Sequence, residues 1–137
     1  MRSGCSDRNI DLILTNIMKT GDKHSITIYV SENETAGFLG SGGLNVYATP
    51  AMICHMEKTA FALVEAEGFQ TVGTKVEISH LRACKVGTEI KVTAELVEVD
   101  GRRLEFTVKA EDANGIIGEG KHQRFIIDPE KFMAKLG

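Results

Sequence analysis

Several features that would place this 137-residue chain in a specialised class are missing from its sequence. Its three cysteines, Cys5, Cys54 and Cys84, form no CxxC pair and have no zinc-site spacing, so neither a disulfide framework nor a zinc domain is indicated. No apolar stretch approaches the roughly 20 residues that a membrane-spanning helix needs. The first seven residues lack the apolar core of a signal peptide. These absences predict a cytoplasmic protein with reduced cysteines.

The chain also lacks a large excess of either positive or negative charge. The formal net charge is -3 and the isoelectric point is near 5.8, which gives no electrostatic field for attracting nucleic acid. The hydrophobic content of 42% and the charged content of 26% are ordinary globular values. Because there is no internal repeat, low-complexity tract or Pro-rich linker, we expect a single domain over residues 1–137. Neither a nucleic acid nor a membrane is expected as a partner.

The chain shows the alternation of apolar and polar residues that is typical of β-strands. Asp100-Gly101 and Asn114-Gly115 are signals of tight hairpins. Residues 31–44 are rich in glycine and turn formers, and we expect a mobile loop or flap there. Strands are predicted at residues 24–30, 71–81, 88–99, 104–110 and 116–127, followed by a short terminal helix at 130–136.

One long helix is predicted from about Thr49 to about Glu67. Thr49 suits the N-cap, Pro50 suits the first helical position, and Gly68 suits the end of the helix. Between residues 51 and 64 the helix has no clean polar face, so we expect it to be buried on almost all sides.

Glu57 lies in the middle of this apolar helix. A carboxylate held among apolar neighbours is costly unless it is paired, hydrogen-bonded or used in catalysis, and such groups are candidate site residues. The alternative is a surface pair with Lys58 at one uncovered corner of the helix. Glu57 is therefore a candidate catalytic residue.

One strand, a loop, a buried helix and a four-stranded antiparallel meander form the pattern of an α+β hot-dog fold. In this fold a curved antiparallel sheet of about five strands wraps one long central helix. The helix would keep some uncovered apolar surface, and the sheet would keep an open edge. We therefore expect a homodimer.

Thr49 and His80 are two further candidates for a site. The helix start at Thr49 carries free N–H groups and partial positive charge that could stabilise an oxyanion, although Thr49 could also be a simple cap. His80 shares a strand face with Val76 and Ile78, toward the helix. It could shuttle protons, or it could be a satisfied core histidine. Glu57 is eight residues after Thr49, about 12 Å along the axis, so a substrate, a water or a second copy must bridge them.

Gly73 and Arg124 are candidates for binding a substrate. Gly73 has the opposite parity to His80 in its strand, and a glycine inside a strand often marks a bulge or the close approach of a ligand. Arg124 shares a face with His122 and could hold a phosphate or carboxylate, or it could belong to a solvated strand face. His55 and His122 lack the spacing of a metal pair with the cysteines, so no metal and no other cofactor is expected.

A set of short motifs follows a fixed order along the chain. They are Val46–Thr49, Met56–Glu57, Thr71–Thr74, Ile78–His80, Val86–Gly87, Val99–Leu104, Ile117–Arg124 and Lys131–Phe132. As an ordered set with preserved spacing, they resemble the fluoroacetyl-CoA thioesterase-like family of hot-dog thioesterases over nearly the whole chain after about residue 20. The resemblance implies that Thr49, Glu57 and His80 are catalytic and that Gly73 and Arg124 bind substrate.

The activity implied by the resemblance is hydrolysis of a short-chain acyl-CoA to the free acid and CoA. Glu57 would act as a base or nucleophile, with His80 and Thr49 assisting. The fluoroacetyl-specific member of the family has aromatic residues in the lid before the threonine. This chain instead has glycines at 40, 42 and 43, with Phe38 nearby, so we expect an ordinary short acyl group. Two alternatives stay open from the residues alone: an acyl-CoA-binding protein without catalysis, and a hot-dog enoyl-CoA hydratase or dehydratase.

Overall fold

The structure is a computed structural model that describes residues 18–137. The expectations for the N-terminal segment and Cys5 lie outside this range. Along the chain the elements are β1 (Lys23–Tyr29), the 3₁₀ helix η1 (Glu32–Glu34), α2 (Ala36–Leu39), α3 (Thr49–Glu65), β2 (Gln70–His80), β3 (Glu89–Asp100), β4 (Arg103–Asp112), β5 (Gly115–Ile127) and α4 (Pro129–Ala134). No helix in residues 18–137 is both long and apolar enough to cross a membrane.

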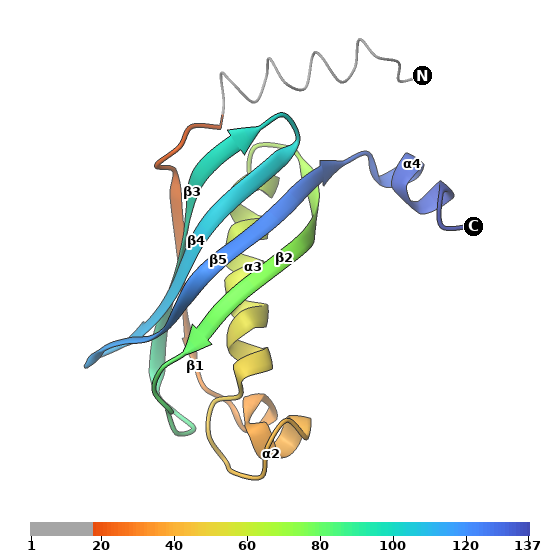
Figure 1. Ribbon diagram of the computed structural model, residues 1–137. Helices are drawn as coiled ribbons and strands as arrows, with labels where there is room; N and C mark the ends of the chain where they lie inside the picture. The colour runs from red at the N-terminus through yellow and green to blue at the C-terminus, as the bar shows by residue number, and fades with distance from the viewer. Residues whose placement is uncertain (1–17) are drawn as a thin grey trace.

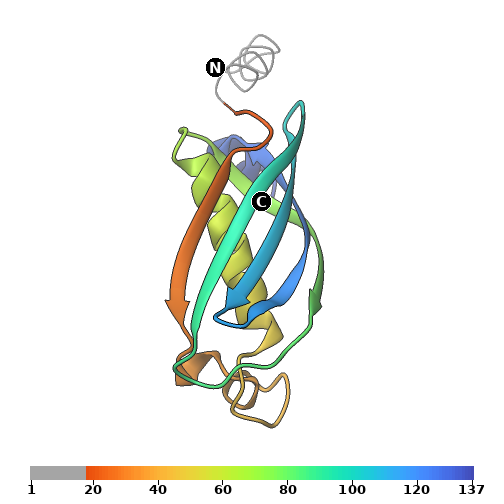
Figure 2. The same ribbon diagram turned by 90° about the vertical axis from the view of Figure 1, so that its left-hand side faces the viewer.

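The strands form one antiparallel sheet in the order β1-β3-β4-β5-β2, which leaves β1 and β2 as its edges. The sheet curls around α3 (Figure 1), and the turned view in Figure 2 also shows α3 inside the curve. Gly101 and Gly115 make the two predicted hairpin turns, with φ values of +61° and +127°. Both values lie in the region that favours glycine. The predicted strands and hairpins are therefore confirmed.

One side of α3 supplies the centre of the core. Met52, Met56, Ala60 and Val64 follow one another at a spacing of four residues, and each has 0% of its surface exposed. Residues four apart lie on one side of a helix, so this stripe faces the concave side of the sheet. The inward-facing residues of β3 and β4 are buried against it, including Leu96 and Phe106. Burying each large side chain contributes about 1.5–3 kcal/mol.

The expectation that α3 is buried on almost all sides is wrong for a single chain. A second stripe at the same spacing is only partly covered: Thr49 is exposed, and Ile53, Glu57 and Phe61 are half-buried. Helix boundaries also differ from the prediction. Ala48 is the N-cap, Thr49 is already helical and makes no capping hydrogen bond, and the helix ends at Glu65 before the turn at Gly68.

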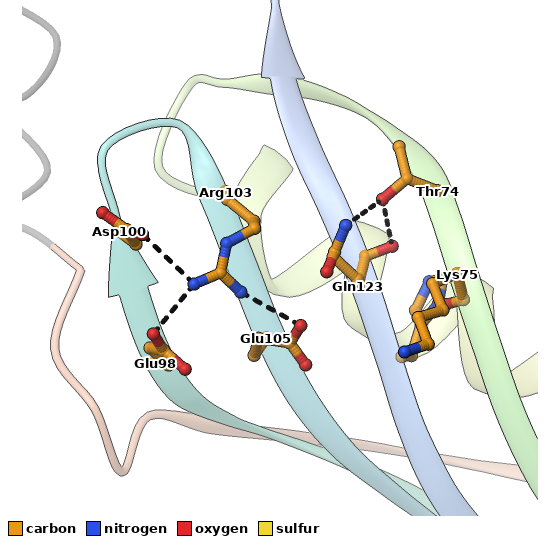
Figure 3. Close-up of polar contacts among 8 residues, drawn as sticks. Thr74, Lys75, Glu98, Asp100, Arg103, Glu105 and Gln123 are labelled. Atoms are coloured by element: carbon orange, nitrogen blue, oxygen red, sulfur yellow. Dashed lines mark hydrogen bonds and ion pairs between the residues drawn. The ribbon is translucent and has the colours of Figure 1, made fainter.

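The regular alternation predicted for β2 is interrupted by a β-bulge. The pairing of β2 with β5 shifts between Gly73 and Lys75, so Thr74 is an extra residue in the strand. Figure 3 shows Gln123 reaching across to Thr74, where its Nε2 donates to Thr74 Oγ1 at 2.9 Å. The bulge changes the parity of the strand, so Gly73 and His80 both face α3. The prediction that Gly73 and His80 have opposite parity is wrong for this reason.

The segment expected to be a mobile loop contains two short helices, η1 and α2. Thr35 caps α2 by accepting a hydrogen bond from the backbone N–H of Phe38 at 3.2 Å. Thr35 also forms an isolated β-bridge with Tyr47, which ties the two ends of the segment together. Between them, Phe38 and Leu44 are exposed. The segment is therefore a lid with a fixed base, next to the start of α3 (Figure 1).

Two glycines of β5 give a graded test of this packing. A Cβ at Gly118 would lie 2.5 Å from Met52 Sδ, whereas a Cβ at Gly120 would overlap the backbone oxygen of Glu77. We expect Gly118→Ala to lower the free energy of unfolding by about 1–3 kcal/mol, the usual cost of overpacking. Gly120→Ala should lower it further because backbone yields less than a methionine side chain.

Urea unfolding of the purified variants measures this difference. Gly43→Ala is the matched control, because a Cβ there has open space around it and should change stability by less than about 0.5 kcal/mol. Equal stability of all three variants would contradict the packing described here.

Candidate active site

The five predicted site residues all lie where the partly covered side of α3 runs beside β2 and β5. They form two groups rather than one. Thr49 and His80 make the first group, at the start of α3 and the end of β2. Glu57, Gly73 and Arg124 make the second, two helical turns further along α3.

In the first group, the hydroxyl of Thr49 is hydrogen-bonded to His80, with 2.7 Å between Oγ1 and Nδ1. Burial lowers the pKa of His80, and a weaker interaction with the Arg82 backbone opposes this change. Its other nitrogen, Nε2, is buried and has no hydrogen-bond partner among residues 18–137. Since buried polar atoms are almost always paired, this nitrogen is a candidate for contact with a substrate or a second chain.

A chain of hydrogen bonds lies next to the first group and runs from Tyr47 through His55 to Glu34. The Tyr47 ring lies edge-on to His80, with 6.3 Å between ring centroids, and its hydroxyl bonds Nδ1 of His55. The other nitrogen of His55, Nε2, lies 3.0 Å from the Glu34 carboxylate. Because the carboxylate can only accept, His55 donates to it from Nε2. Burial raises the pKa of Tyr47, which keeps its hydroxyl protonated.

This chain of hydrogen bonds joins η1, the segment just before α3 and α3 itself, so it fixes the base of the lid. A cavity of about 310 Å³ lies beside it, bounded by Tyr47, Thr49 and His80 and by Ser41 of the lid. Neither Tyr47 nor His55 was predicted as a site residue. The only signal for Tyr47 was its place in the motif before Thr49.

In the second group, the absent side chain of Gly73 lets three polar side chains approach its backbone closely. A Cβ at Gly73 would lie 2.9 Å from Glu57 Oε2, 3.2 Å from Arg124 Nη1 and 3.2 Å from His122 Cε1. Within residues 18–137, Glu57 makes no hydrogen bond or salt bridge. A small polar group placed above Gly73 would therefore touch a carboxylate and a guanidinium at the same time.

Arg124 is not on a solvated strand face, because only 7% of its surface is exposed. Its Nε donates to Thr71 Oγ1 at 2.8 Å and its Nη2 donates to the Thr71 carbonyl at 3.1 Å. The third contact is from Nη1 to Nε2 of His122, at 3.1 Å. The guanidinium also lies 5.5 Å from the centroid of the Phe61 ring, a cation–π distance. Burial lowers the pKa of Arg124 and the charge of Glu57 opposes this, so the group stays cationic.

The structure brings Thr49 to His80 and Glu57 to Gly73 and Arg124, but it does not bring Glu57 to His80 within one chain. Thr49 and Glu57 are about 12 Å apart along the helix axis, and Ile53 lies between them. Sequence reasoning missed Thr71 and His122, which hold Arg124. The shared strand face of His122 and Arg124 was the available signal.

Comparison with known proteins gives a consistent family. The family model described as fluoroacetyl-CoA-specific thioesterase matches residues 30–130. A fluoroacetyl-CoA thioesterase from Streptantibioticus cattleyicolor is 40% identical over 94 residues, which cover 66% of this chain and 68% of that protein.

Solved structures agree with this result. A variant of the fluoroacetyl-CoA thioesterase FlK in complex with acetyl-CoA is 31% identical, with a TM-score of 0.81 over 87% of this chain and 96% of that one. A thioesterase superfamily member from Thermus thermophilus is 27% identical, with a TM-score of 0.79 over 87% and 90% of the two chains. A hot-dog-like protein from Thermanaerovibrio acidaminovorans, 21% identical with a TM-score of 0.82 over 90% and 93%, confirms the predicted fold. This chain therefore belongs to the fluoroacetyl-CoA-specific thioesterase family, a group of thioester hydrolases with the hot-dog fold.

Proposed function

We propose that the protein hydrolyses a short-chain acyl-CoA to the free acid and CoA, with the thioester carbonyl bound above Gly73. The observation that carries this proposal is the close approach of Glu57 Oε2 and Arg124 Nη1 to the same side of Gly73. A carbonyl oxygen there accepts a hydrogen bond from Nη1, whose charge stabilises the oxyanion that forms when the carbonyl is attacked. The carboxylate of Glu57 lies beside the same position.

Glu57 supports either of two routes to the acid. As a general base it takes a proton from a water molecule, which attacks the carbonyl carbon. As a nucleophile it attacks that carbon itself and forms an anhydride, which water then opens. In both routes the C–S bond breaks and the thiolate of CoA leaves. His80, held by Thr49, is placed to give that thiolate a proton.

Arg124 is assigned to the acyl end of the substrate rather than to a CoA phosphate. It is buried, and three of its N–H groups are already used by Thr71 and His122. A phosphate carries its own hydration and would need an exposed cation. The N–H groups that remain on Arg124 fit a small, dehydrated acceptor such as a carbonyl oxygen.

A complete site needs Glu57 from one copy of the chain and His80 from another. The β2 edge is exposed from Gly73 to Glu77, and Val76 is 43% exposed although it faces α3. Figure 1 shows α4 extending past this edge, where Met133 is 63% exposed. A second copy that pairs its β2 antiparallel with this one covers these groups and satisfies the edge. A twofold axis midway between Gly73 and His80 places His80 of each copy opposite Gly73 of the other.

The charges of the second group favour a neutral acyl chain. Glu57 and Arg124 carry one negative and one positive charge, and they compensate each other while His122 is neutral. An acyl group with its own carboxylate would place a second negative charge beside Glu57. The unpaired thiols of Cys54 and Cys84 suit a reducing cytoplasm as the place of action.

Two single variants and their mixture test the division of the site between copies. Glu57→Gln and His80→Ala should each lower acyl-CoA hydrolysis by at least about 100-fold, the usual effect of losing a general acid or base. Co-refolding the two variants forms heterodimers in which one of the two sites has both native residues. Thiol release should then recover to about a quarter of the wild-type rate by the statistics of random pairing of two-fold dimers.

Separately refolded variants mixed without denaturant are the control for this recovery. No recovery after co-refolding would place the whole site in one chain, and near-normal turnover by both single variants would remove the proposed function. Tight CoA binding without thiol release by the wild-type protein would point to an acyl-CoA-binding role instead.

Gly73→Ala should block the site with little change to the fold. The added methyl would lie 2.9 Å from Glu57 Oε2, inside the space proposed for the carbonyl. We expect kcat/KM to fall by about 10- to 100-fold, equivalent to about 1.4–2.8 kcal/mol in transition-state binding. The free energy of unfolding should change by less than about 1 kcal/mol. Gly43→Ala is again the control, and full activity of Gly73→Ala would place the thioester elsewhere.

A panel of acyl-CoA substrates tests the charge argument. Acetyl- and propionyl-CoA should be hydrolysed with kcat/KM at least about tenfold higher than malonyl- and succinyl-CoA, because like charges placed together are strongly unfavourable. Thiol release measures each rate, and inhibition by free CoA controls for binding of the shared part. Faster hydrolysis of the carboxylated substrates would show that Arg124 pairs with the substrate instead of Glu57.

A further inference from the structure

We propose that His122 is a positioning residue for the acyl site, in which a neutral imidazole protonated on Nδ1 holds Arg124 Nη1 beside Glu57 and Gly73. This inference rests on the proposed function, because it explains what orients Arg124 Nη1, the group that donates to the oxyanion in that function. His122 is not suggested to touch the substrate.

His122 lies under the site and is closed off from solvent. It is 1% exposed, on the α3-facing side of β5, opposite Val76 of β2 and Phe106 of β4. Its ring packs against the ring of Phe106, with 6.3 Å between centroids. In this position the imidazole can exchange hydrogen bonds only with the protein groups around it.

The two partners of His122 define its protonation state. Arg124 Nη1 can only donate, so Nε2 of His122, at 3.1 Å, must carry no proton. The Lys75 carbonyl can only accept, so Nδ1 of His122, at 2.8 Å, must carry one. Both contacts are satisfied by the neutral Nδ1–H form and by no other form of the ring.

The bond from Arg124 to His122 decides where the reactive end of the guanidinium points. Thr71 holds Nε and Nη2 on one side, and His122 holds Nη1 on the other. Nη1 is the nitrogen that lies 3.2 Å from the Cβ position at Gly73. With one N–H of Nη1 bound to His122, its second N–H is directed away from His122, and the planar group cannot turn about its own axis.

A protonated His122 would undo this arrangement. It would lose its acceptor for Arg124 and would place two cations 3.1 Å apart. Burial lowers the pKa of His122 most, the charge of Arg124 lowers it further, and the bond to Lys75 and the charges of Glu57 and Glu105 oppose the change. The charged residues around the ring are Glu57 on α3, Glu105 on β4, Arg124 and Lys121 on β5, and Lys75 and Glu77 on β2.

The sign of the resulting pH dependence follows from this lowered pKa. Between the folded-state pKa of His122 and the unfolded value near 6.5, the unfolded chain binds more protons than the folded one. The contribution of His122 to stability is therefore intact above about pH 6.5 and is lost as pH falls below it. Activity should persist to lower pH, until the folded-state imidazole itself is protonated.

Two variants separate positioning from packing. His122→Gln keeps an acceptor for Arg124 at about the place of Nε2, whereas His122→Phe keeps a ring against Phe106 but accepts nothing. We expect kcat to fall by about 10- to 100-fold in His122→Phe, the range for losing one hydrogen bond to a charged group. KM should change by less than about threefold, and His122→Gln should recover most of kcat. His24→Gln, on β1, is the matched control and should have wild-type kinetics.

The tautomer of His122 is a readout that does not need activity. Nitrogen-15 NMR of the four histidines, assigned by single replacements, should show His122 as neutral Nδ1–H at pH 7. In His122→Gln, the acid side of the kcat/KM profile should become less steep by one proton, and the fall of stability below pH 6.5 should be smaller.

The possible results distinguish a failure of the role proposed for His122 from a failure of the proposed function. If the wild-type protein hydrolyses acyl-CoA and loses activity with Glu57→Gln, but His122→Phe is as active as wild type, the inference is wrong and the function stands. A charged or Nε2–H His122 at pH 7 also overturns it. If no acyl-CoA is hydrolysed while the Nδ1–H form is observed, the function fails although the hydrogen-bond geometry is as described.

Discussion

The extra residue at Thr74 is the constraint on which the candidate site depends. Gly73 and His80 are seven residues apart, and in a regular strand an odd separation places two residues on opposite faces of the sheet. One inserted residue restores them to the same face. Without the bulge, either His80 would leave Thr49 or Gly73 would turn away from Glu57.

Side chains of β5 hold the bulge from both faces of the sheet. Gln123 binds the hydroxyl of Thr74 on the outer face, while His122 binds the carbonyl of Lys75 from the inner face. The same His122 accepts from Arg124. The backbone of β2 and the guanidinium of β5 are therefore fixed through one side chain, so the irregular strand and the charged group beside it form a single unit.

Much of the fold could be predicted because it depends on local patterns. The hairpins at Gly101 and Gly115 are specified by their own dipeptides, and the long helix is bounded by Pro50 and Gly68. The bulge could not be placed in the same way. It requires knowing that Thr74 faces Gln123, a residue 49 positions away, and alternation within β2 alone contains no trace of that contact.

The five candidate site residues could be chosen from the sequence, whereas their arrangement in space could not. Thr49, Glu57, Gly73, His80 and Arg124 were singled out from the chain, and the structure places each of them on the α3–β2–β5 surface. Their division into two groups follows from helix geometry, since eight residues always separate two side chains by about two turns. Arg124 differs most from expectation. A solvated strand face was possible from the sequence, but Thr71 and His122 bind the guanidinium inside the protein.

The lid combines a fixed base with glycines that lie in open space. Its base is fixed to α3 through Glu34, His55 and Tyr47, whereas a Cβ at Gly40 or Gly43 would meet nothing within 4 Å. Glycines in open space cannot form an apolar wall against an acyl group or against water. In the proposed function, discrimination between acyl groups therefore falls to the fixed charges of Glu57 and Arg124 and to the space above Gly73. In that proposal Glu57, Arg124 and Gly73 select by size and charge, and the glycines of the lid add no side chain to this selection.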